Sequence, residues 1–182
     1  MKKHILLSVA MLSISSIAVA TPVTRTTTYD GSKYDGTDVV VRDKSAGTYS
    51  RDTMVNRASD GATATRNYDR TRTDSGVAAS GNVIGFSGKT RSFDYSRTRT
   101  DQGVIANGTA VGRNGQTYSL SAQGVRTDTG YTRDRTITNG VGDTLYDRNV
   151  SVSRADGRVS RDVSVTKAQA FKRPRFGVGR RR

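Results

Sequence analysis

A short motif that occurs three times in this chain contains side chains that could take part in catalysis or binding. Residues 71–76 read TRTDSG, residues 98–103 read TRTDQG and residues 125–130 read VRTDTG. Each copy supplies a carboxylate, which could take part in acid–base catalysis or bind calcium, and an arginine, which could bind an anion. The closing glycines are 27 residues apart, so the motif belongs to a tandem repeat rather than to a single site.

Catalysis is disfavoured by the residue types that the chain lacks. Its one histidine, His4, stands in the first 20 residues, and the chain has no Cys and no Glu. Ser-His-Asp and Cys-His arrangements and His/Cys zinc sites are therefore excluded from the remainder. A pair of aspartates could still hydrolyse a glycoside, but the repeated aspartates precede glycines at positions typical of turns. We predict no enzymatic activity, no catalytic residue and no cofactor.

Motifs for calcium and nucleotides are also missing. The calcium loop D-x-[DN]-x-[DN]-G does not occur, and neither do the Gly-Gly-x-Gly-x-Asp nonapeptides of calcium-binding β-rolls. One aspartate per turn supplies too little negative charge for a calcium site. No glycine loop of the Walker or dinucleotide-binding type is present. We predict no metal site.

The first 20 residues have the features of a secretory signal peptide. Lys2 and Lys3 give a basic start, 5–20 is mostly apolar, and 18–20 reads AVA, a small-x-small cleavage site. The apolar stretch is too short to span a bilayer comfortably, and no basic stop-transfer cluster follows it. We predict an exported chain that begins near Thr21, has no transmembrane segment after cleavage, and resides in the periplasm, on the cell surface or outside the cell.

The composition after residue 20 predicts a thin β structure. Only 17 Val, 3 Ile, 2 Leu and 4 Phe stand in this part, too few for a thick core. Thr, Val, Tyr and Arg are frequent and Pro occurs only twice, which favours strands over disorder. Every acidic residue is Asp, which favours turns over helices.

A second glycine series, at Gly61, Gly88, Gly115 and Gly142, has the same spacing and divides each repeat into two parts. Each part is long enough for one strand and one turn, and the loops are too short for parallel crossovers. We predict an all-β fold: an antiparallel β-meander of 27-residue hairpin repeats, as an extended twisted sheet or a flattened solenoid. The predicted segments are a signal peptide (1–20), a degenerate N-terminal β segment (21–60), the β-hairpin repeat region (61–167) and a flexible, disordered basic tail (168–182).

The turn chemistry suggests which residues share a face. Thr-Asp-x-Gly suits a three-residue hairpin loop that ends in a left-handed glycine, which would make 74–76 the loop and place Thr73 opposite Val77. In the third and fourth repeats the division between the faces then blurs, because Arg133 and Arg154 change sides. The predicted faces of the first hairpin are Thr71, Thr73, Val77, Ala79 and Val83 on one side, and Tyr68, Arg70, Arg72, Ala78, Ser80 and Ile84 on the other.

Anion binding is the most specific chemistry that these residues offer. The chain carries 30 basic and 16 acidic residues, a net charge of +14. Arginine forks bind phosphates and sulfates through paired hydrogen bonds, aromatic rings beside them stack on bases or sugars, and a basic tail adds sequence-independent attraction. On the strands the arginines could instead pair with cross-strand Asp and Thr and keep the sheet soluble. The candidate anion-binding residues are Arg70, Arg72, Arg97, Arg99, Lys172, Arg173, Arg175, Arg180, Arg181 and Arg182, and the candidate stacking residues are Tyr68, Phe93 and Tyr95.

These features together predict a structural or adhesive role. We expect an exported, non-enzymatic repeat protein of the bacterial cell surface or extracellular matrix that binds anionic polymers and self-associates. The polymers that such a protein meets are lipopolysaccharide, acidic glycans and extracellular DNA. The alternative is a soluble periplasmic binding module that uses an Arg/Tyr sheet face for one specific anionic ligand.

Overall fold

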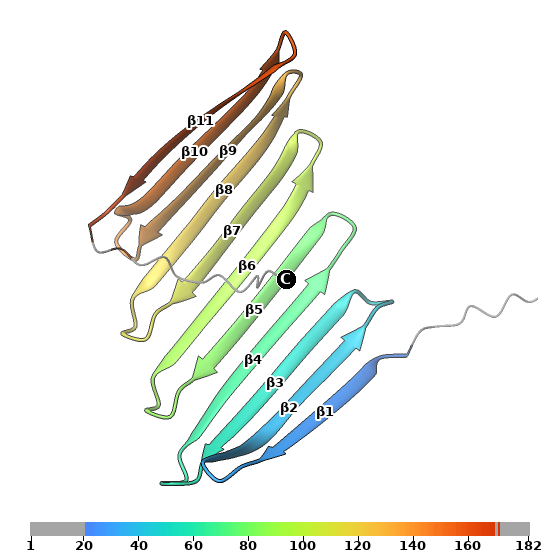
Figure 1. The fold of residues 1–182 in the computed structure, drawn as a ribbon, viewed down its shortest axis with the longest axis vertical. Helices are drawn as coiled ribbons and strands as arrows, with labels where there is room; N and C mark the ends of the chain where they lie inside the picture. Colours follow the sequence, from blue (N-terminus) through green and yellow to red (C-terminus); the bar gives the residue numbers. More distant parts are fainter. Residues whose placement is uncertain (1–20, 170, 172–182) are drawn as a thin grey trace, which may run out of the picture.

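The chain folds into one open antiparallel β-sheet (Figure 1). A computed structural model describes residues 21–169 and residue 171. Within them eleven strands lie side by side in sequence order, no helix occurs, and the sheet is not closed. The strands are β1 (Val23–Asp30), β2 (Tyr34–Asp43), β3 (Thr48–Arg57), β4 (Thr63–Arg72), β5 (Gly76–Ile84), β6 (Thr90–Thr100), β7 (Gly103–Val111), β8 (Thr117–Thr127), β9 (Gly130–Asn139), β10 (Thr144–Ala155) and β11 (Arg158–Lys167).

The predicted all-β meander is therefore confirmed, and of the two predicted forms the chain adopts the extended sheet. Short loops join each strand to the next, so every neighbouring pair is antiparallel and hairpin-like units recur along the sheet. The segment 21–60, predicted as degenerate, contributes β1 to β3 to this same sheet.

The loops within the TRTDxG motifs are one residue shorter than predicted. Thr73 and Gly76 exchange backbone hydrogen bonds in both directions, with N···O distances of 3.0 and 3.2 Å, so only Asp74 and Ser75 form the loop. Gly76 does not have a positive φ, and the predicted left-handed glycine at this position is wrong. Left-handed glycines close the loops at the other end of the hairpins instead: Gly88, Gly115 and Gly142, with φ of 72°, 76° and 94°.

This difference of one residue reverses the faces of the return strands, because successive side chains of a strand alternate between the two faces. Arg72 lies opposite Val77, and Arg70 lies opposite Ala79. The predicted faces are therefore wrong for β5. Val77, Ala79 and Val83 share a face with Tyr68, Arg70 and Arg72, whereas Ala78, Ser80 and Ile84 share a face with Thr71.

A small core lies on one side of this single layer. Ile137 is fully buried, and Leu120, Tyr146 and Phe171 cluster with it. Long side chains from β4, β6 and β8 flank small residues of β5 and β7, so their stems and rings can shield the small residues from water. The other buried residues are on the same face: Ala79, Ala106, Ala110, Val150 and Val152.

Candidate anion-binding face

The strands separate the charged residues between the two faces of the sheet. Because side chains alternate along a strand, the strand pairing assigns each residue to one face. We name the face that carries Arg70 the arginine face and the face that carries Asp69 the carboxylate face. Among strand residues, every basic residue except Arg158 lies on the arginine face, and every acidic residue except Asp38 lies on the carboxylate face.

The two faces of one sheet therefore have opposite charge. The arginine face carries seventeen basic residues: Arg25, Arg42, Arg51, Arg57, Arg66, Arg70, Arg72, Arg91, Arg97, Arg99, Arg126, Arg133, Arg135, Arg148, Arg154, Arg161 and Lys167. The carboxylate face carries nine aspartates: Asp30, Asp35, Asp43, Asp52, Asp69, Asp94, Asp134, Asp147 and Asp162.

All the predicted site residues on β4 and β6 lie on the arginine face. The small residues of β5 stand between them: Val77 lies between Arg72 and Arg97, and Ala79 lies between Arg70 and Tyr95. Gly81 separates Tyr68 from Phe93, and without a side chain between them the two ring centroids approach to 6.2 Å. The structure thus brings together Tyr68, Arg70, Arg72, Phe93, Tyr95, Arg97 and Arg99.

The backbone fixes the arginine of each TRTDxG motif through the loop of the preceding hairpin. The Arg99 N–H donates a hydrogen bond of 2.6 Å to the Ser75 carbonyl, and the Arg126 N–H donates one of 2.9 Å to the Gln102 carbonyl. Equivalent bonds join Arg72 to Gly47 and Arg154 to Thr129, at 2.9 and 2.7 Å. These bonds set the motif arginines at one end of the arginine face.

The arginines of β4 and β6 differ in exposure. Arg72, Arg97 and Arg99 are exposed and form no ion pair with another described residue. Arg70 is half-buried: its guanidinium carbon lies 6.0 Å from the centroid of the Tyr49 ring, a cation–π arrangement. The Arg70 Nε is buried and has no hydrogen-bond partner among the described residues. Three of these side chains therefore offer free donors to solvent, and the fourth holds one unused donor below the surface.

Arg51 shows the alternative fate of a strand arginine. Its Nε lies 2.7 Å from Asp38 Oδ1, the one carboxylate among the described strand residues of this face. The hydrogen bond from Arg51 is the main cause that lowers the pKa of Asp38, and the Thr53 hydroxyl donates a further one at 2.8 Å. The same pair raises the pKa of Arg51. Cross-strand pairing thus neutralises the charge of Arg51, whereas Arg97 and Arg99 of β6 form no ion pair with another described residue.

Sequence reasoning missed the arginines of β9 and β10. Arg135 lies opposite Arg148, and Arg133 lies opposite Val150, all on the arginine face. The expectation that Arg133 changes sides was wrong for the same reason as the β5 assignment, namely the shorter loop. Arg154 stands before its loop, and the register shift between Thr144 and Tyr146 in β10 places it on the arginine face. Alternation counted back from Asn139 would have found the positions of Arg133 and Arg135.

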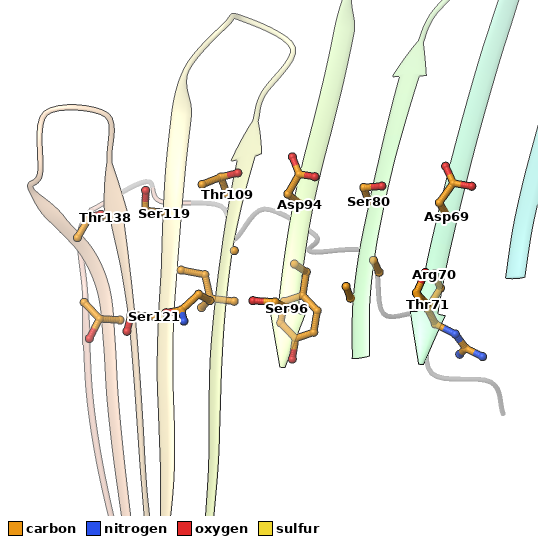
Figure 2. Close-up of a pocket in the computed structure, with 17 residues that line it drawn as sticks. Asp69, Arg70, Thr71, Ser80, Asp94, Ser96, Thr109, Ser119, Ser121 and Thr138 are labelled. Atoms are coloured by element: carbon orange, nitrogen blue, oxygen red, sulfur yellow. The ribbon is translucent and has the colours of Figure 1, made fainter. Parts of the chain in front are cut away.

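The carboxylate face is hollowed over β4 to β9. The hollow has a volume of about 730 Å³, and small hydroxyl-bearing residues and Asp69 and Asp94 line much of it. Figure 2 shows Asp69, Ser80, Asp94 and Thr109 side by side on successive strands. Both aspartates are exposed.

Some of the predicted features lie outside the residues that the structure describes. The signal peptide and the candidates Lys172, Arg173, Arg175, Arg180, Arg181 and Arg182 lie outside the described residues. Residues 21–169 and 171 hold no group of three or more His, Cys, Asp or Glu side chains that could bind a metal ion. In this same part, no helix has the length and apolar character needed to cross a membrane.

No protein-family model, curated protein or solved structure matches this chain.

Proposed function

We propose that this chain is an exported, non-enzymatic protein of the bacterial cell surface or extracellular matrix that binds anionic polymers through its arginine face. One observation carries the proposal: the strand arginines, except Arg158, lie on one face of an open sheet, with Asp38 as the single carboxylate among the described strand residues there. A face of one charge sign attracts a polymer of the opposite sign along its whole length. Lipopolysaccharide, acidic glycans and extracellular DNA have this chemistry.

The geometry of the arginine face suits a polymer better than a single small anion. Within one strand, arginines at alternate positions such as Arg97 and Arg99 are about 7 Å apart. Arginines on β4 and β6 are about 10 Å apart, because one strand of small residues separates them. Guanidinium groups repeated on such a lattice can contact successive phosphates or sulfates, and each contact releases counterions. The rings of Tyr68, Phe93 and Tyr95 lie among them and can stack on bases or sugars.

A specific small-ligand module remains the second candidate, and the state of Arg70 favours it. The unpartnered Nε of Arg70 lies beside the Tyr49 ring, below the level of the exposed arginines. A buried donor without a partner is costly, so an anion that reached Arg70 would gain a strong charge-assisted hydrogen bond. This module would bind a small sulfate or phosphate ester with an affinity that does not grow with polymer length.

Heparin fragments of increasing length separate the two candidates. For polymer binding, calorimetry should show affinity that rises with fragment length, and R97Q/R99Q should lower the affinity about tenfold at low salt. The matched control is R113Q/R158Q, which removes the same charge from the β7–β8 loop and the carboxylate face. Equal losses for the two variants would contradict binding by the arginine face. Affinity that is independent of length and lost in R70Q would favour the small-ligand module.

A further inference from the structure

The opposite charges on the two faces also identify a protein partner. No second layer of strands covers either face in the described part of the chain, in which Phe171 covers the arginine face only around Leu120, Ile137 and Tyr146. Two arginine faces repel each other, and so do two carboxylate faces. An arginine face and a carboxylate face attract each other, and each copy of the chain has both.

We propose that the chain stacks on itself, with the arginine face of one copy on the carboxylate face of the next. This inference adds a partner to the arginine face and does not rest on polymer binding. The contact joins two different surfaces, so it is heterologous, and an added copy always leaves one face of each kind free. The resulting column of sheets is open-ended.

On β4 the opposite charges lie close together in such a stack. Asp69 and Arg70 are neighbours on β4, and Asp94 lies two strands away on β6 together with Arg97. A copy displaced along the sheet normal by the usual sheet-to-sheet distance, about 10 Å, therefore places the Asp69 carboxylate over Arg70 on β4, and sets Asp94 three residues, about 10 Å, along β6 from Arg97. The strand lattices agree because the two sheets are identical.

The shapes of the two faces are also compatible. The carboxylate face is hollowed over β4 to β9 and lined there by small side chains such as Ala78, Ser80 and Ser121. The arginine face projects long side chains from β4 and β6 on either side of the small residues of β5. Long side chains of one copy can therefore enter the hollow of the next.

Variants that neutralise one face at a time test the stack. D69N/D94N alters only the carboxylate face, and R97Q/R99Q alters only the arginine face. All four residues are exposed, so neither variant should disturb the fold, and far-UV circular dichroism checks this. Analytical ultracentrifugation of the purified protein at low salt should show open-ended association that each variant weakens at least tenfold. The control D101N/D128N makes the same change of charge as D69N/D94N, but in two hairpin loops, and should associate like the unaltered protein.

Mixing the two variants gives the sharpest result. The intact arginine face of D69N/D94N can dock on the intact carboxylate face of R97Q/R99Q, so the mixture should form two-copy complexes where neither variant associates alone. Three outcomes would overturn the proposal. The unaltered protein could stay monomeric at low salt, or the mixture could lack the two-copy complex. Association could also be unaffected by both variants, which is the result expected for pairing between edge strands. D69N/D94N retains the complete arginine face, so its heparin affinity tests polymer binding separately.

Discussion

The backbone carbonyl oxygen of Arg97 occupies the place where a side chain at Gly76 would begin. A Cβ built on Gly76 would lie 2.0 Å from that oxygen, well inside contact distance. The same relationship recurs along the sheet, where a Cβ on Gly103 would lie 1.9 Å from the Gly124 oxygen, and one on Gly130 would lie 1.8 Å from the Val152 oxygen. The glycine that closes each TRTDxG motif is thus required by the approach of the following strand.

Gly76→Ala should therefore destabilise the protein by more than about 2 kcal/mol, because the obstacle is backbone and cannot change rotamer. Gly124→Ala is the matched control: it is also a strand glycine without positive φ, and its Cβ would meet only the Thr132 oxygen at 3.8 Å. Its stability should change by less than about 0.5 kcal/mol. Urea unfolding followed by circular dichroism measures both, and equal effects would contradict the steric explanation.

The fold was predictable from the sequence because its signals are local. Glycine spacing, turn residues and β-forming residues all indicate hairpins within a few residues of each other. The sharing of one face by Arg70 and Arg72 followed from alternation within a single strand. The faces of β5 were predicted wrongly, since a loop of two residues instead of three reverses a whole strand.

The need for glycine at position 76 could not be predicted from local sequence signals. The obstructing oxygen belongs to Arg97, which lies beside β5 only in the folded sheet. The burial of Ile137 beside Phe171 likewise depends on a distant segment that returns to the sheet. The predicted anion-binding residues on β4 and β6 are gathered on one face, whereas the separation of carboxylates to the other face depends on the register of every hairpin.

Truncation of the core should weaken this thin sheet strongly. Ile137 is 0% exposed on the arginine face, and Ile137→Ala should cost about 3 kcal/mol, since it removes buried methyl groups and leaves a cavity. Ile105→Ala is the matched control, because Ile105 is 41% exposed on the carboxylate face and should cost less than about 1 kcal/mol. Thermal unfolding compares them, and a similar loss for both would show that Ile137 is not a core residue.

The ion pair between Asp38 and Arg51 should make stability depend on pH in the acid range. The Asp38 pKa is lowered in the folded chain, mainly by the hydrogen bond from Arg51, so its ionised form is the stabilising one. The contribution is below about 1 kcal/mol, because Arg51 is 44% exposed and solvent screens the pair. It is complete above the unfolded pKa of about 4 and is lost as the pH falls through the lower folded pKa.

Asp38→Asn should accordingly lower the free energy of unfolding by up to about 1 kcal/mol at pH 7, and the gap to the unaltered protein should narrow as the pH falls below about 4. Urea unfolding at each pH measures the gap. In a double-mutant cycle, R51Q should have little further effect in the Asp38→Asn background. A gap that stays constant as the pH falls below about 4 would rule out this ion pair as its cause.

The salt dependence of DNA binding should count the arginine contacts. Each phosphate contact contributes about 0.9 to the slope of log K against log salt concentration, so R97Q/R99Q should reduce the slope by about 2. A chain that ends after Phe171 lacks six basic residues and retains the core aromatic ring, and its slope should fall by up to about 5. If the strands and the tail bind DNA independently, R97Q/R99Q should remove the same increment from the shortened chain. Fluorescence anisotropy with short duplex DNA measures the slopes, and an unchanged slope for R97Q/R99Q in both chains would locate the binding away from the arginine face.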